Sequence, residues 1–110
     1  MSSMKNFKKD ELIVKEGEKA KIFFILVDGK VGLFRNTEKI AEFSKSGDIL
    51  GEVSFILNKP RSGTLKALTD CSLLTVEGEL DDIIKQYPDI SKKLIRTLAE
   101  RLSKAAVHGI

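Results

Sequence analysis

The stretch GDILGEVSFILNKPRSGTLKA, residues 47–67, is the part of the chain around which the rest can be interpreted. It contains a carboxylate, Glu52, and a guanidinium, Arg61, nine positions apart. Between them lie an apolar run, 53–57, and an Asn-Lys-Pro turn. This intervening segment is too short to be a separate domain element, and small residues flank both charged groups.

These residues have the donors and acceptors of an anion pocket. Gly51 lacks a Cβ, so its backbone can approach a ligand closely or adopt positive φ. If 53–57 forms a helical turn, its first N–H groups lack intrahelical partners and suit a phosphate. Arg61 can add two parallel donors to phosphate oxygens, and the hydroxyls of Ser62 and Thr64 can add more.

Glu52 needs a different role, because a carboxylate only accepts hydrogen bonds. A sugar hydroxyl beside the phosphate would supply the donor. The simpler interpretation is an ordinary surface ion pair between Glu52 and Arg61, which contributes little to stability, with Gly51 as a plain turn residue.

The stretch resembles the phosphate-binding cassette of cyclic nucleotide-binding domains, found in the catabolite activator protein, protein kinase A regulatory subunits and gated channels. That pattern is Gly-Glu-apolar-small, a variable turn, then Arg-small-Ala and Thr or Ser. Here it reads Gly51-Glu52-Val53-Ser54 and then Arg61-Ser62-Gly63-Thr64. Gly63 replaces the usual Ala, which we expect to be a mild change. The resemblance extends over residues 5–106.

The resemblance implies a sensor that binds cAMP or cGMP, with no metal and no catalytic residue. Arg61 would neutralise the cyclic phosphate, and Glu52 would accept a hydrogen bond from the ribose 2′-hydroxyl. Ser62, which follows the arginine, leaves the choice between cAMP and cGMP open. The ligand-binding residues implied are Gly51, Glu52, Val53, Ser54, Arg61, Ser62, Gly63 and Thr64.

Composition limits the class of protein. The 110 residues suffice for one domain, 1–110, and 42% are hydrophobic while 32% are charged. No apolar run is long enough for a membrane span, and no secretory signal is visible. The single Cys71 excludes an internal disulfide and fits a cytoplasmic location. The net charge of +3 is spread along the chain and does not by itself indicate nucleic-acid binding.

Short apolar segments separated by turn residues predict a mainly β fold. Residues 1–10 are expected to be a loose lead-in or one helical turn, with Phe7 packing inward. Asp28-Gly29 is typical of a hairpin turn, and Asn36-Thr37 of the next turn. The expected strands are 12–15, 22–27, 30–34, 40–43, 64–68 and 72–76. The resemblance implies an eight-stranded jelly-roll β-barrel over 5–77 that includes the cassette at 47–67.

From Gly78 the apolar period becomes helical, which predicts two C-terminal helices within 78–107. Pro88 would end the first helix and allow the second, 89–107, to start. The second helix has a wide apolar stripe of Ile90, Leu94, Leu98, Leu102 and Ala105, with Ile95, Ala99 and Ala106 beside it. This stripe would pack on the barrel, or partly on a second copy, since the resemblance implies a homodimer seam here.

The chain contains no DNA-binding helix-turn-helix after these helices, so we expect the signal to pass to an unknown effector protein through ligand-induced movement of the helices. The alternatives are a ligand-free interaction module on the same fold, or a binder of another phosphate compound. An enzyme is not expected, because no nucleophile–base pair is readable. His108, the only histidine, is expected to be solvated, and a metal enzyme would need several such ligands.

Overall fold

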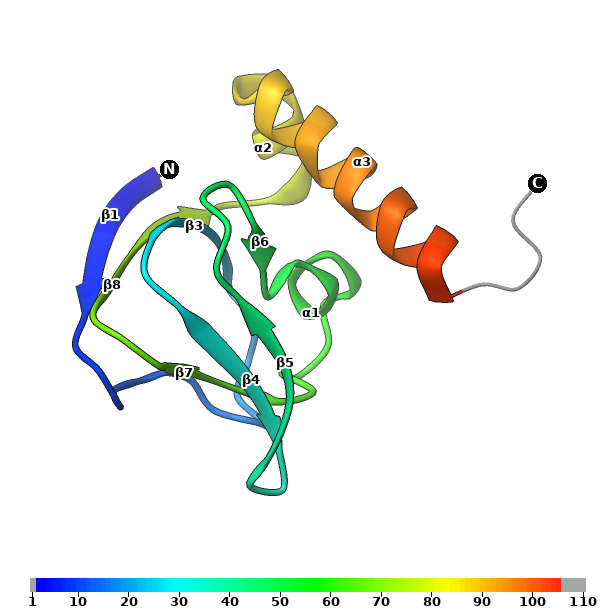
Figure 1. Cartoon of the computed structure of the whole chain (residues 1–110). Helices are drawn as coiled ribbons and strands as arrows, with labels where there is room; N and C mark the ends of the chain where they lie inside the picture. Colours follow the sequence, from blue (N-terminus) through cyan, green and yellow to red (C-terminus); the bar gives the residue numbers. More distant parts are fainter. Residues whose placement is uncertain (1, 106–110) are drawn as a thin grey trace. The chain divides into compact units, whose positions relative to one another are not determined.

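A computed structural model describes residues 2–105, and it divides the chain into two compact units, Met1–Gly78 and Glu79–Ile110 (Figure 1). The first unit consists of two four-stranded sheets and one short helix. One sheet has the order β1 (Ser2–Phe7), β8 (Cys71–Glu77), β3 (Ile22–Asp28), β6 (Ile49–Leu50). The other has the order β2 (Leu12–Val14), β7 (Thr64–Ala67), β4 (Val31–Arg35), β5 (Glu38–Phe43). All strand pairs are antiparallel.

The two turns predicted around β4 behave differently. Asn36 and Thr37 do form a hairpin between β4 and β5, and both have positive φ, 49° and 70°, as a two-residue primed turn requires. The Asp28-Gly29 hairpin was wrong, because β3 and β4 belong to different sheets. Gly29 has φ +96°, and a Cβ there would lie 2.4 Å from the Asp70 carbonyl oxygen. Gly29 therefore lies where the chain passes from one sheet to the other, and there is no room for a side chain at this position.

The first residues form a strand and not the loose lead-in that was expected. β1 pairs with β8 over its whole length, from Ser2↔Val76 to Phe7↔Cys71. Most of β1 is exposed, so its sequence lacks the apolar alternation of a half-buried strand. Backbone pairing and side-chain bonds such as Ser72 Oγ to Asn6 Oδ1, 2.7 Å, stabilise it instead. The inward packing of Phe7 is confirmed.

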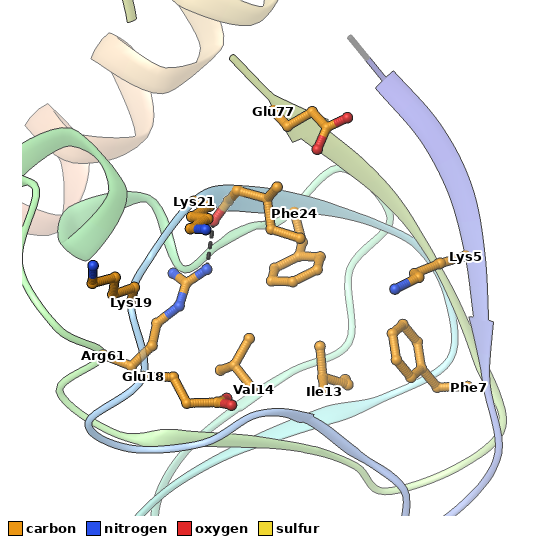
Figure 2. A pocket seen from close by; sticks show the side chains of 11 residues that line it. Lys5, Phe7, Ile13, Val14, Glu18, Lys19, Lys21, Phe24, Arg61 and Glu77 are labelled. Carbon is orange, nitrogen blue, oxygen red and sulfur yellow. Dashed lines mark hydrogen bonds between the residues drawn. The ribbon is translucent and has the colours of Figure 1, made fainter. Parts of the chain in front are cut away.

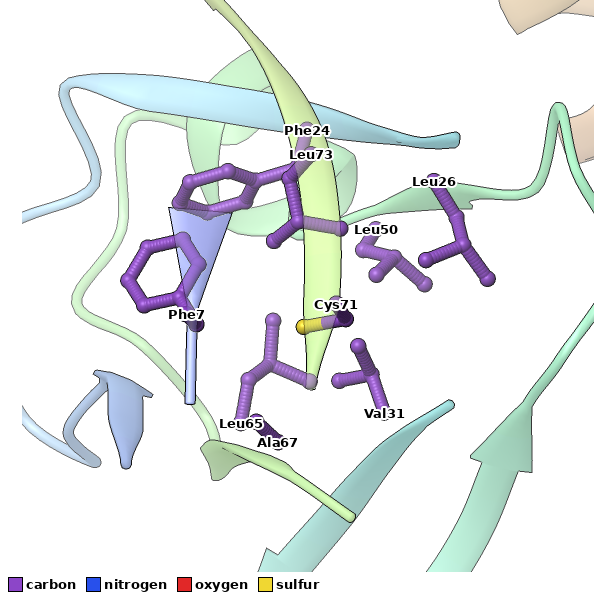
Figure 3. Close-up of a cluster of buried hydrophobic side chains, with 9 residues drawn as sticks. All are labelled: Phe7, Phe24, Leu26, Val31, Leu50, Leu65, Ala67, Cys71 and Leu73. Atoms are coloured by element: carbon purple, nitrogen blue, oxygen red, sulfur yellow. The ribbon is translucent and has the colours of Figure 1, made fainter. Parts of the chain in front are cut away.

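The core of the first unit lies between the two sheets and contains side chains from both (Figure 3). Cys71, the first residue of β8, belongs to this core. Burial raises the pKa of its thiol, and the nearby carboxylate of Asp70 adds to this effect. The buried members are Phe7, Phe24, Leu26, Val31, Leu50, Leu65, Ala67, Cys71 and Leu73.

The mainly β fold with C-terminal helices is confirmed, but the expected closed barrel is wrong. Within residues 2–105, no strand of one sheet pairs with a strand of the other. The edge strands explain this, since β2 and β6 have only three and two residues. Such short edges offer too few backbone groups to close the sheet on itself. The eight-stranded jelly roll stays a prediction.

The second unit contains α2 (Leu80–Gln86) and α3 (Pro88–Ala105), which contact each other. Pro88 opens α3, a position where its missing N–H costs no hydrogen bond. Along the predicted stripe Leu94 is buried and Leu102 is 67% exposed, and Ile95, predicted beside the stripe, is 70% exposed. Ala106, Val107 and His108 lie outside the described residues. Neither α2 nor α3 is long and apolar enough to cross a membrane, and the same is true of α1 (Glu52–Leu57).

Gly29→Ala tests the crossing between the sheets, with Gly17→Ala as its matched control. Both glycines have positive φ, but a Cβ at Gly17 would have nothing within 4 Å. We expect Gly17→Ala to lower the free energy of unfolding by about 1 kcal/mol through backbone strain alone. Gly29→Ala adds a steric clash and should cost about 3 kcal/mol. Equal losses in urea denaturation would contradict this account of Gly29.

Candidate functional site

Arg61 is the central residue of the candidate site, and it is buried with only 5% of its surface exposed. It stands between α1 and β7. Its Nη1 donates a hydrogen bond of 2.7 Å to the carbonyl oxygen of Gly51, and its Nη2 donates to that of Ile22. The guanidinium therefore joins the residue before α1 to the first residue of β3.

The backbone of Arg61 is also held in place. Its N–H donates to the carbonyl oxygen of Glu18 at 2.8 Å, and its own carbonyl accepts from the N–H of Gly17 at 2.9 Å. In addition, the N–H of Glu16 donates to Thr64 Oγ1 at 3.1 Å. These three hydrogen bonds hold the loop between β2 and β3 against the segment that contains Arg61 and Thr64.

The charge of Arg61 is stabilised by dipoles and by carboxylates. Burial lowers the pKa of its guanidinium, and the negative charges of Glu18 and Glu52 offset part of that effect. An arginine remains a cation at neutral pH even so. Its Nε is buried and has no hydrogen-bond partner within residues 2–105. Arg61 Nε is therefore a buried donor without a protein acceptor, and an acceptor could reach it only if the groups around it move.

The short helix α1 sets the distance between Glu52 and Arg61. Gly51 precedes it with φ +75°, and a Cβ there would lie 2.7 Å from Arg61 Nη1, so the close approach requires glycine. Asn58 ends the helix, also in the left-handed region. Phe55 packs against Phe23 of β3 with ring centroids 5.2 Å apart. Glu52 is 2% exposed, so both charged groups of the predicted pair are buried.

A cavity of about 510 Å³ lies beside Arg61 (Figure 2). This volume lies in the range of small-molecule sites, about 300–1,000 Å³. Its apolar side chains are Phe7, Ile13, Val14, Ile22 and Phe24. Its charged side chains are Lys5, Glu18, Lys19, Lys21, Arg61 and Glu77. The cavity can accept a partly apolar anion of nucleotide size.

Of the eight predicted ligand-binding residues, only Arg61 lines this cavity. Gly51 contacts Arg61 directly, and Glu52 acts on it through its charge. Ser54 is buried in α1. Val53 is 51% exposed and Ser62 is exposed, its carbonyl oxygen accepting from Arg35 Nε at 3.1 Å. Thr64 Oγ1 is used by the loop before β3.

Sequence reasoning missed the charged residues that line the cavity around Arg61. Glu18, Lys19 and Lys21 belong to the run GEKAK after β2, to which the sequence analysis assigned no binding role. Its density of charge so close to a glycine could have suggested a ligand-facing loop. Lys5 lies in the segment 1–10, which was expected to be only a loose lead-in or one helical turn. Within residues 2–105, no group of three or more His, Cys, Asp or Glu is placed to hold a metal ion.

The replacement of the usual alanine by Gly63 was expected to be a mild change, but the space around Gly63 is more restricted than that. A Cβ there would lie 2.8 Å from Leu33 Cδ1 and 2.9 Å from the backbone oxygen of Phe34. Phe34 pairs with Thr64 in the ladder between β4 and β7, so this oxygen cannot retreat easily. The packing around Gly63 therefore disfavours the alanine that is usual in the cassette.

Comparison with known proteins identifies the class. The family model described as the cyclic nucleotide-binding domain matches residues 4–87, and the chain belongs to this family. A cGMP-dependent protein kinase of Plasmodium berghei is 38% identical over 71 residues, which cover 64% of this chain and 8% of the kinase. The chain thus spans a small part of that relative.

Two solved structures are similar over most of the chain. The catabolite activator protein of Thermus thermophilus matches with a TM-score of 0.81 and 25% identity, covering 94% of this chain and 51% of that one. The structure titled cAMP-bound PfPKA-R matches with a TM-score of 0.74 and 31% identity, covering 94% of this chain and 35% of that one. The expected membership of the family is confirmed.

Gly63→Ala tests the packing of the cassette. We expect it to lower the free energy of unfolding by about 1–3 kcal/mol, because the added methyl group meets a backbone oxygen. Ser62→Ala, at the exposed neighbouring position, is the control and should change stability by less than about 0.5 kcal/mol. Urea denaturation measures both. A Gly63→Ala protein as stable as the control would contradict this account and show that glycine in place of alanine is only a mild change.

Proposed function

We propose that this chain binds cAMP or cGMP in the cavity beside Arg61 and acts as a regulatory sensor module without catalytic activity of its own. The observation that carries the proposal is a buried arginine on the wall of a nucleotide-sized cavity, with one donor unpartnered within residues 2–105. Membership of the cyclic nucleotide-binding family supports it.

Arg61 would hold the cyclic phosphate. Its Nε can donate to one phosphate oxygen. Its Nη groups can give up a backbone carbonyl and donate to a second phosphate oxygen instead. Charge-assisted hydrogen bonds of this kind contribute about 1.5–3 kcal/mol each. Lys19 and Lys21 line the same cavity and add positive charge near the anion.

Binding would rearrange the cassette. Glu52 does not line the cavity, so it could accept from a ribose 2′-hydroxyl only after α1 shifts toward the ligand. The backbone and hydroxyl groups of residues 51–54 and 62–64 would contact the phosphate in that closed arrangement. A ligand that prefers the closed arrangement shifts the population toward it.

The signal would leave through α2 and α3. Gly78 joins β8 to the second unit with φ +129°, a backbone conformation that suits a hinge. Exposed Ile95 and Leu102 on α3 could contact an effector protein or a second copy of the chain. We propose a cytoplasmic location for this module. A ligand-free interaction module, or a binder of another phosphate compound, is the alternative.

Titration calorimetry with cAMP and cGMP tests the proposal on the wild-type chain, Arg61→Lys and Arg96→Lys. Lysine keeps the charge of Arg61 but loses the planar pair of donors, so Arg61→Lys should weaken binding by about tenfold or more. Arg96 lies on α3 and is not among the residues that line the cavity, so its variant should bind like the wild type. Circular dichroism checks that each variant is folded.

Absence of heat for both nucleotides at about 1 mM ligand, where even a millimolar complex would form, would refute nucleotide binding. It would favour the interaction module instead. Equal affinities of all three proteins would refute the role of Arg61 while leaving the ligand class intact.

A further inference from the structure

The net positive charge of the chain is concentrated on one helix, α3. The whole chain has 19 Lys and Arg and 16 Asp and Glu, which gives a net charge of +3. α3 alone has a net charge of +3, so the charges of the rest of the chain cancel. The cationic residues of α3 are Lys92, Lys93, Arg96, Arg101 and Lys104, and its acidic residues are Asp89 and Glu100. A local excess of one sign attracts the opposite sign, so α3 is the element that favours an anionic partner.

α3 also exposes apolar side chains in one line. Ile95, Ala99 and Leu102 are exposed, and their spacing of four and then three residues places them along the same side of the helix. We call these three residues the exposed strip. Lys92, three residues before Ile95, extends the same line, and Arg96, one turn after Lys92, lies at its border. The exposed strip thus has positive charge at one end and at one side.

Lys92 and Arg96 are available to a partner. Within residues 2–105 neither forms an ion pair or a side-chain hydrogen bond. The acidic side chains next to them along the helix are Asp89, three residues before Lys92, and Glu100, four residues after Arg96. Such spacings permit ion pairs on a helix surface, but in this part of the chain neither pair forms. Carboxylates from outside the chain can therefore pair with both cations.

The narrow form of the exposed strip favours a helix as the partner. Apolar residues that recur at spacings of four and three residues are the pattern by which two helices pack along a seam. A helix that lies in a membrane interface needs a wider apolar face, rich in Trp, Phe or Leu. The exposed strip consists of one isoleucine, one alanine and one leucine, so it suits a protein helix better than a lipid surface.

The charge of α3 disfavours a second copy of the chain as that partner. Packed helices lie about 8–10 Å apart, so two α3 helices would bring two net charges of +3 to a distance at which salt screens them only in part. If the two helices were parallel, Lys92 of each would also face its counterpart in the seam. A partner helix with acidic residues at these positions replaces both repulsions by attractions.

We infer that the exposed strip binds an acidic amphipathic helix of a partner protein; this inference rests on the proposed role of α3 in passing on the signal. Apolar side chains of the partner helix pack on Ile95, Ala99 and Leu102, and Asp or Glu residues beside them pair with Lys92 and Arg96. Charges beside an apolar seam determine which helices pair, because a helix of the same sign is repelled.

The test uses a fluorescent synthetic peptide of three heptads, with leucine at the first and fourth positions of each heptad and glutamate beside them. A matched peptide has lysine in place of glutamate. Fluorescence anisotropy without nucleotide measures binding of each peptide to the 110-residue chain, up to about 1 mM, where even a millimolar complex would form.

Three double variants are compared with the wild type, and circular dichroism checks that each is folded. The first removes the exposed strip, the second removes the cations beside it, and the third removes two cations from the opposite side of α3. The third variant is the matched control for the second, since both lose two positive charges from the same helix. The variants are Ile95→Ser with Leu102→Ser, Lys92→Gln with Arg96→Gln, and Lys93→Gln with Lys104→Gln.

We expect the wild type to bind the glutamate peptide at least about tenfold more tightly than the lysine peptide. Loss of Ile95 and Leu102 should weaken binding of the glutamate peptide by about tenfold or more, because two apolar contacts disappear. Loss of Lys92 and Arg96 should weaken it about fivefold. The control variant should change it by less than about twofold, because its charges lie away from the exposed strip.

Equal binding of the two peptides, equal losses in the two charge variants, or no binding of either peptide would overturn this inference. Two further measurements would overturn it by showing another occupant. One is a wild-type dimer in sedimentation equilibrium that Ile95→Ser with Leu102→Ser abolishes, and the other is sedimentation of the wild type with phosphatidylserine vesicles that the same variant abolishes. Each of these results leaves nucleotide binding intact, because the calorimetry with cAMP and cGMP tests that function separately.

Discussion

The buried guanidinium of Arg61 is the interaction on which the first unit depends near its cavity. Its side chain bonds to the carbonyl oxygens of Gly51 and Ile22, and its backbone bonds to residues 17 and 18. A buried charge is costly unless it is well hydrogen-bonded, so these segments must stay in place around it. Any acceptor that replaces one of the carbonyls acts on α1, on β3 and on the loop before β3 together.

The sequence predicted the features that depend on local pattern. Alternating apolar residues located most strands, and the turn composition of Asn36-Thr37 located one hairpin. The site predicted from the order of Gly51, Glu52 and Arg61 stays a prediction. The sequence could not predict what depends on long-range pairing. β1 lacks an apolar pattern and is held by β8, some seventy residues later. The dipeptide Asp28-Gly29 suits a hairpin turn and a crossing between two sheets equally well, so its composition could not distinguish them.

The cavity shows a second limit of sequence reasoning. Lys5 and Lys21 look like ordinary solvated lysines, because nothing local distinguishes a lysine at a cavity from one on an open surface. Only the arrangement of β1 and of the loop before β3 brings them to the cavity that Arg61 lines. The second unit is simpler, since Pro88 and helical periodicity predicted both helices. Ile95 and Leu102, which are exposed on α3, are the residues proposed to contact an effector protein or a second copy of the chain.

The central claim is that Arg61 itself binds the anion of the ligand, and its Nε–H proton reports on this directly. In nitrogen-15 nuclear magnetic resonance, addition of cGMP or cAMP should move the Arg61 Nε–H signal downfield and slow its exchange with water, as the unpartnered donor gains a phosphate acceptor. Arg35→Lys, Arg96→Lys and Arg101→Lys variants assign the signal by elimination. A ligand that binds while the Arg61 signal keeps its position and exchange rate would contradict the account.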